Sequence, residues 1–264
     1  KLANYIFAHT GEAQYFSIST LAENSGVSEA SITRFCHRLG LAGYNDFKLA
    51  LAKASGAPAA DDEVGIYGKV LPEDSITDMC KKLYATNVAA IDQTLAQIDE
   101  GNVGRAVKYL SAAQRVYCFG QGGSLVIAME AWARFITAAP QFQCIEDSHM
   151  QAMAAALSTP DDVILFFSYS GATKDMLDVL RPARRRGAKI ILVTHFAKSP
   201  AAAMADVTLL CGSKEGPLQS GSVAAKMGLL FIIDVLFNEY CRTNPALTEA
   251  NREATAGAIS AKLL

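Results

Sequence analysis

The sequence predicts an α/β protein in which an N-terminal all-α domain precedes a doubly wound, five-stranded parallel sheet. Two observations carry this prediction. Apolar residues recur at helical spacing over residues 2–39, and strand-like apolar runs alternate with helical stretches further along the chain. The five runs are 116–119, 141–145, 163–167, 190–194 and 207–211. Each interval between them is long enough for the crossover helix that parallel strands require.

Three short helices are predicted at the N-terminal end. Within residues 2–8, Leu2, Tyr5 and Ile6 lie at helical spacing, which predicts a first helix that ends near Gly11. Ser17 is placed to cap the second helix, Gly26 to turn the chain, and Ser28 to cap a third helix that runs through Leu39. Two helices joined by a tight glycine-containing turn are typical of a DNA-reading helix-turn-helix.

The third of these helices has an inward and an outward face. Ile32, Phe35 and Leu39 are expected to face inward, which leaves the polar positions for DNA grooves or phosphates. The DNA-contact candidates are Ser28, Glu29, Ala30, Ser31, Thr33, Arg34, His37, Arg38 and, further along, Lys48. Residues 1–53 hold five Lys and Arg against four Asp and Glu, so the net charge is +1 (5 − 4) and phosphate attraction is weak. His37 has no second ligand at a useful spacing, so no metal is predicted there.

A linker is predicted over residues 54–74, where Ala, Gly, Pro and a short acidic run replace helical periodicity. This divides the chain into a DNA-binding domain (1–53), the linker, and a ligand domain (75–264). The ligand domain opens with a long amphipathic helix after Ser75. Its apolar stripe is Ile76, Met79, Leu83, Val88, Ile91, Leu95 and Ile98. This stripe could pack on the ligand domain or on a second subunit.

The run 163–167 ends in hydroxyl residues at the point where a helical pattern begins. Ser168, Ser170 and Thr173 surround Gly171, which lets the backbone approach a ligand closely. A strand-to-helix junction exposes backbone N–H groups and the positive end of the helix dipole. This favours a phosphate cradle, while the simpler alternative is that Ser170 only caps the helix.

Residues 168–173, Ser-Tyr-Ser-Gly-Ala-Thr, resemble the S-x-S-G-x-T signature of the sugar isomerase (SIS) domain, whose members bind phosphosugars. Residues 119–124 resemble the earlier G-x-G-x-S turn of that domain. Together with the helix-turn-helix pattern and the segment 34–48, these motifs make the whole chain similar to the RpiR family of bacterial transcriptional regulators. The resemblance implies a flavodoxin-like sheet, operator DNA and a phosphosugar effector as partners, and a homodimer or homotetramer. The implied effector-binding residues are Gly120, Gln121, Gly122, Ser124, Ser168, Tyr169, Ser170, Gly171, Thr173 and Glu215.

Other chemistries fit less well. A dinucleotide site would need a third glycine where Leu125 stands, and both a P-loop and a G-x-S-x-G nucleophile elbow are missing from the sequence. A sugar-phosphate isomerase is the enzymatic alternative, with Glu215 as its best carboxylate and His149 and Lys226 as further candidates. The helix-turn-helix argues against it, so no catalytic residue and no cofactor are predicted. His149 could equally line a pocket or only sit at a helix start.

Composition sets broader limits. The 264 residues carry a formal charge of −2, so any DNA contact must use a local patch. Three consecutive arginines at 184–186 are expected to be solvated at a helix end and not to form that patch. The six cysteines contain no C-x-x-C pair and indicate reduced thiols. The sequence has no long apolar run and no signal peptide, which predicts a cytoplasmic protein without a membrane partner.

Overall fold

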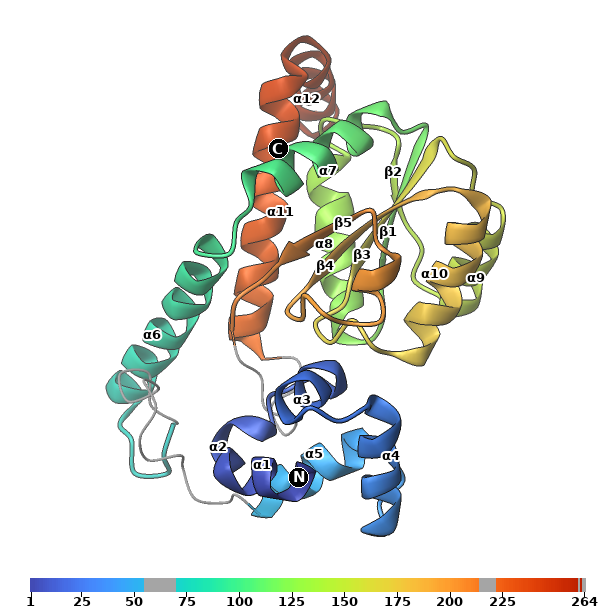
Figure 1. Cartoon of the computed structure of the whole chain (residues 1–264). Helices are drawn as coiled ribbons and strands as arrows, with labels where there is room; N and C mark the ends of the chain where they lie inside the picture. The colour runs from blue at the N-terminus through green and yellow to red at the C-terminus, as the bar shows by residue number, and fades with distance from the viewer. Residues whose placement is uncertain (55–69, 214–221, 261, 263–264) are drawn as a thin grey trace. The chain divides into compact units, whose positions relative to one another are not determined.

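The computed structural model describes residues 1–54, 70–213, 222–260 and 262 (Figure 1). These residues separate into two compact units. One contains the described parts of 1–90 and 213–225, and the other contains 91–212 and the described parts of 226–264. Most of the predicted linker, residues 55–69, lies outside the described residues.

The N-terminal domain is all helical, as predicted. Its helices are α1 Leu2–Ala8, α2 Thr10–Ala13, α3 Ile18–Ser25, α4 Glu29–Arg38 and α5 Tyr44–Ala54. They share a small core made of Leu2, Ile6, Leu21, Ile32, Cys36 and Phe47. The prediction that Leu39 faces inward is wrong, because it follows the last turn of α4 and is 55% exposed. Cys36, one turn after Ile32, occupies the inward position instead.

The second unit contains the predicted five-stranded parallel sheet. The strands are β1 Arg115–Gly120, β2 Phe142–Cys144, β3 Asp162–Phe167, β4 Lys189–Thr194 and β5 Val207–Leu210. Their order is β2-β1-β3-β4-β5, and every pair is parallel. β3 is buried along its whole length, as expected for a central strand covered on both faces.

Helices cover the two faces of the sheet. On one face, α7 Glu100–Ala112, α8 Gly123–Phe135 and α11 Val223–Thr243 pack in a core that includes Val116, Leu165 and Val193. On the other face lie α9 Ser148–Ala156 and α10 Lys174–Arg186 (Figure 1). The short helix η2 Ala202–Met204 precedes β5, and α12 Pro245–Ser260 ends the chain.

The predicted long helix is α6 Ile76–Leu95, and the hydroxyl of Ser75 accepts the backbone N–H of Asp78 at 3.1 Å to cap it. Its apolar stripe is only partly covered within the described chain: Ile76 is 77% exposed and Leu95 58%. Near its end, however, Thr94 is fully buried.

The amino ends of β1 and β3 are joined by an ion pair between Arg115 and Asp162. The guanidinium donates from Nε to Oδ1 at 2.9 Å and from Nη2 to Oδ2 at 2.7 Å, while the Thr159 N–H and hydroxyl also donate to Oδ2. Burial alone would raise the pKa of Asp162, but these hydrogen bonds hold it below its ordinary value.

The cysteines are all free thiols, and burial raises the pKa of Cys36 and Cys118. Throughout the part of the chain that the structure describes, His, Cys, Asp and Glu form no group that could hold a metal ion. In the same residues, no helix is both long enough and apolar enough to cross a membrane.

Candidate functional site

The strand order places the two sequence motifs side by side. The chain leaves β1 toward β2 on one side and returns to β3 on the other, so the direction of winding reverses between β1 and β3. Gly120 and Phe167, the last residues of these strands, are register partners. The turns that follow them therefore start next to each other, at the carboxyl edge where such sheets bind ligands.

The first turn runs from Gly120 to Ser124. A side chain at Gly120 would collide with the carbonyl of Ser124, so only glycine lets the strand end approach α8 this closely. Gly122 is the N-cap residue of α8 and has a φ of 54°, so no side chain caps the start of this helix.

The second turn, residues 168–173, uses its hydroxyls differently from a simple helix cap. The buried Ser168 Oγ accepts the N–H of Gly171 at 3.2 Å, and Ser170 Oγ accepts that of Ala172 at 3.4 Å. Each O–H proton can therefore still be donated to a ligand. Thr173 is the N-cap residue of α10, yet its side chain makes no capping hydrogen bond. Gly171 has a φ of 59°, which favours glycine.

Two buried side-chain atoms near these turns have no hydrogen-bond partner among the described residues: Gln121 Nε2 and Gln151 Oε1. Gln151, on α9, is fully buried and donates from Nε2 to the carbonyls of Gly120 and Ile145, at 3.0 and 2.7 Å. It links the ends of β1 and β2. Sequence reasoning missed it, although a lone glutamine among the apolar residues of 150–157 was a usable signal.

Aromatic rings adjoin the second turn. Tyr169 stacks on His195 with ring centroids 5.0 Å apart and an interplanar angle of 4°, and Phe196 lies edge-on to both. His195 directly follows β4, so its place at the carboxyl edge could have been predicted from the sheet rule but was not.

The remaining predicted residues lie in several places. Glu215 is outside the described residues, so its prediction stays open. His149 is exposed in the first turn of α9, which is capped by Asp147 through the N–H of Met150 at 2.9 Å. Lys226 is half-buried on α11. Arg184 pairs with Asp206 at 3.1 Å, so this arginine of the 184–186 run has a partner on its own unit.

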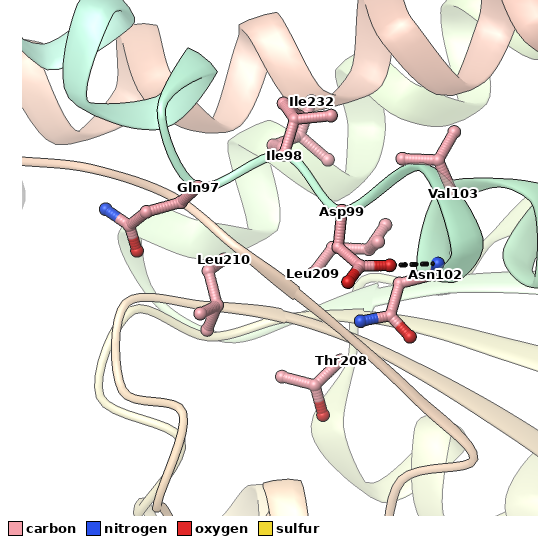
Figure 2. A pocket seen from close by; sticks show the side chains of 9 residues that line it. All are labelled: Gln97, Ile98, Asp99, Asn102, Val103, Thr208, Leu209, Leu210 and Ile232. Atoms are coloured by element: carbon pink, nitrogen blue, oxygen red, sulfur yellow. Dashed lines mark hydrogen bonds between the residues drawn. The ribbon is translucent and has the colours of Figure 1, made fainter.

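A separate hollow of about 230 Å³ lies along β5, away from the motif turns. The loop Gln97–Asp99, the start of α7, β5 and Ile232 of α11 line it (Figure 2). Asp99 is already engaged there, because its carboxylate accepts the N–H of Asn102 at 2.6 Å.

The helix-turn-helix has the predicted local geometry. Ser17 accepts the N–H of Thr20 and Ser28 that of Ser31, so hydroxyls cap both α3 and α4. Gly26 ends α3 with a φ of 62°, in the left-handed conformation that a tight turn needs.

The DNA-contact candidates on α4 differ in accessibility. Arg34 is exposed and donates to Ser31 Oγ at 3.0 Å, and His37 is exposed and hydrogen-bonded to the carbonyl of Ala42 at 3.1 Å. The exposed candidates are Ser28, Glu29, Ala30, Arg34, His37 and Arg38, while Ser31, Thr33 and Lys48 are half-buried. The half-buried Lys48, whose pKa is lowered by burial, is less accessible to a phosphate than the exposed Arg34 and Arg38.

Family models match both parts of the chain. The model described as "Helix-turn-helix domain, rpiR family" matches residues 1–57, and the "SIS domain" model matches residues 109–238.

Similar proteins extend over nearly the whole chain. An HTH-type transcriptional regulator of Clostridium perfringens is 31% identical over 90% of this chain and 85% of its own length. The regulator YbbH of Bacillus subtilis is 29% identical over 90% and 83%. Among solved structures, Vibrio vulnificus NanR complexed with ManNAc-6P has a TM-score of 0.88 at 27% identity and covers 100% of this chain and 93% of its own. The sugar isomerase domain of an RpiR transcription factor from Sphaerobacter thermophilus shares the fold, with a TM-score of 0.61 at 20% identity, covering 66% of this chain and 96% of its own.

Proposed function

Because the chain belongs to the rpiR family of helix-turn-helix transcriptional regulators, we propose that residues 1–53 read operator DNA and residues 75–264 sense a phosphosugar. Ligand occupancy then changes operator affinity through residues 54–74 and helix α6. This regulator acts in the cytoplasm as a homodimer or homotetramer.

The observation that carries the ligand assignment is the meeting of two glycine- and hydroxyl-rich turns at the reversal point of the sheet. A phosphate there would receive O–H donors from Ser168 and Ser170, N–H groups at the start of α10, and the favourable helix dipole. The uncapped Thr173 and the unpartnered Gln121 Nε2 add donors for phosphate or sugar oxygens.

A matched pair of compounds tests the ligand class. NanR, which aligns with the entire chain, was solved with ManNAc-6P, so this compound is the first to try, followed by phosphorylated hexoses and pentoses. A ligand that binds only the folded state raises the melting temperature. We expect a phosphosugar to do so and the same sugar without phosphate to have little effect. Equal shifts from both members of every pair would contradict a phosphate site.

On the DNA side, the exposed face of α4 supports reading of the major groove by Arg34, with Arg38 and the first turn of α4 near the backbone. Because the domain's net charge is only +1, two copies of the helix on a two-fold symmetric operator would supply the necessary affinity.

We also propose that the ligand domain senses without turnover. The relatives are named as transcriptional regulators, which supports this. The carboxylate that the sequence places best for isomerisation is Glu215. Incubation of the protein with its best-binding phosphosugar, followed by NMR, provides the test. Steady aldose–ketose conversion that disappears in Glu215→Gln would favour the isomerase.

A further inference from the structure

The last turn of α6 packs against two glycines of the ligand domain. The fully buried Thr94 accepts the N–H of Gly212 through Oγ1 at 2.9 Å. A Cβ at Gly212 would stand 2.5 Å from the Cβ of Gln93, and one at Gly228 would stand 2.6 Å from Thr94 Oγ1. Only glycine permits these contacts, so the end of α6 lies directly against Gly212, the second residue after β5, and against Gly228 of α11.

Cys211, the residue before Gly212, is connected to the second motif turn, residues 168–173. The carbonyl of Cys211, which can only accept, receives a hydrogen bond from His195 Nδ1 at 2.9 Å, so Nδ1 carries the proton. The His195 ring lies parallel to that of Tyr169, and its backbone N–H donates to the Tyr169 carbonyl at 3.1 Å. Direct contacts therefore run without interruption from Tyr169 through His195 and residues 211–212 to Thr94.

A surface hollow lies beside the end of α6. Gln97, three residues after Thr94, and Leu210, two residues before Gly212, both line the hollow of about 230 Å³ (Figure 2). Packed interiors resist small displacements, whereas side chains that border a surface hollow have fewer neighbours to constrain them. The connection from α6 to α7 borders such a hollow.

We propose that Tyr169, His195 and Gly212 form a relay that transmits occupancy of the 168–173 turn to Thr94 and hence to α6. The inference rests on the proposed function, since it takes this turn as the effector site. A ligand that reorients Tyr169 shifts the stacked His195 and the Cys211 carbonyl, and the Gly212–Thr94 hydrogen bond is strengthened or broken. This bond is the two-state element that an allosteric coupling requires.

The test measures hydrogen exchange of the Gly212 amide in the full chain, without ligand. Cys211–Gly212 is the only Cys-Gly pair in the sequence, so ¹³C-cysteine and ¹⁵N-glycine labelling isolates this amide by NMR. Arg186–Gly187 is the only Arg-Gly pair, so a second sample with ¹³C-arginine and ¹⁵N-glycine isolates a control amide, which donates to the Arg184 carbonyl at 3.2 Å. Thr94→Val, which keeps the shape and removes the acceptor, should accelerate Gly212 exchange about tenfold, and Thr94→Ser should restore protection.

The decisive variants change His195 and Tyr169, the relay residues that do not contact Thr94. His195→Phe keeps the ring and loses the bond to Cys211, and Tyr169→Leu removes the stack without touching Gly212. Each should accelerate Gly212 exchange by about threefold or more and leave Gly187 unchanged. Unchanged Gly212 exchange in the folded variants, or equal acceleration at Gly187, would overturn the relay. Should Tyr169→Leu not fold, His195→Phe decides alone.

Inorganic phosphate added to the wild-type protein separates this proposal from the proposed function. A change in Gly212 exchange supports both. If phosphate raises the melting temperature and leaves Gly212 exchange unchanged, the relay is wrong and the anion site stands; if phosphate changes neither quantity, the anion site at residues 168–173 is wrong.

Discussion

The two ends of the parallel sheet treat buried polar groups in opposite ways. At the amino end, the Asp162 carboxylate accepts two hydrogen bonds from Arg115 and two from Thr159, so the buried charge is fully engaged. At the carboxyl end, Gln121 Nε2 and Gln151 Oε1 are buried without hydrogen-bond partners among the described residues.

This difference separates stability from binding. A satisfied polar network stabilises the fold, whereas an unsatisfied buried group lowers stability and is retained where a ligand can satisfy it. The amino end is therefore expected to respond to mutation mainly through unfolding, and the carboxyl end mainly through ligand affinity. Each variant below tests that division.

The largest effect is expected at the carboxyl end. Ser168→Ala combined with Ser170→Ala should weaken the phosphosugar by about 3–6 kcal/mol, since each hydrogen bond to a charged group contributes about 1.5–3 kcal/mol. Calorimetric titration measures the loss. Ser168 also accepts the Gly171 N–H, so a stability loss of about 1 kcal/mol should accompany it.

A matched control for this double variant comes from the other end. Ser158 is buried and donates to the Ala155 carbonyl at 2.8 Å, close to the start of β3. Ser158→Ala should lower stability comparably and leave ligand affinity intact. Equal affinities of the double variant and the wild type would remove the phosphate from the 168–173 turn.

The next largest effect belongs to the amino end. Asp162→Asn leaves the Arg115 guanidinium without its anion and should lower the free energy of unfolding by about 1.5–3 kcal/mol, the range for hydrogen bonds to charged groups and below that for a fully buried pair, because the Arg115 side chain is 45% exposed. Because the folded-state pKa of Asp162 is depressed, its contribution is complete above the unfolded value of about 3.9 and is lost as pH falls through the folded value. Urea titrations at several pH values should show the difference from wild type shrinking below about pH 4. Altered ligand affinity at neutral pH would break the division between the two ends.

A variant in the N-terminal unit tests whether DNA binding is independent of the two ends of the parallel sheet. Arg34→Ala should weaken binding to an operator selected from random DNA by about 1–3 kcal/mol and leave both stability and sugar affinity unchanged. Competition with non-specific DNA distinguishes a base contact from a phosphate contact, since the latter weakens all DNA alike. Lys48→Ala is the comparison variant, and its half-buried side chain should matter less for DNA. Full operator affinity in Arg34→Ala would exclude Arg34 from the interface.

The sequence predicted the features that depend on local pattern. Strand runs, capping serines and the turns at 120–124 and 168–173 are all encoded within a few consecutive residues, and the strands and caps are found where they were predicted. The Arg115–Asp162 pair joins residues 47 positions apart, and the roles of Gln151 and His195 depend on which elements pack beside them. These could not be derived from spacing alone. Leu39 fits the inward stripe by periodicity, but the helix ends before that position is covered.

The smallest effect is also the sharpest test of the carboxyl end. Gln121→Leu removes a buried donor that has no partner among the described residues, so the free energy of unfolding should stay unchanged or rise by up to about 1 kcal/mol. Ligand affinity should nevertheless fall, because the donor to the phosphosugar is lost. Paired urea unfolding and calorimetry on the same sample measure both quantities. Gln141→Leu is the opposite case: its amide already donates to the Tyr240 hydroxyl at 3.0 Å, so that variant should lose stability and keep ligand affinity. If Gln121→Leu instead loses stability, Gln121 Nε2 has a partner within the folded protein, and the contrast between the two ends of the sheet no longer holds at this position.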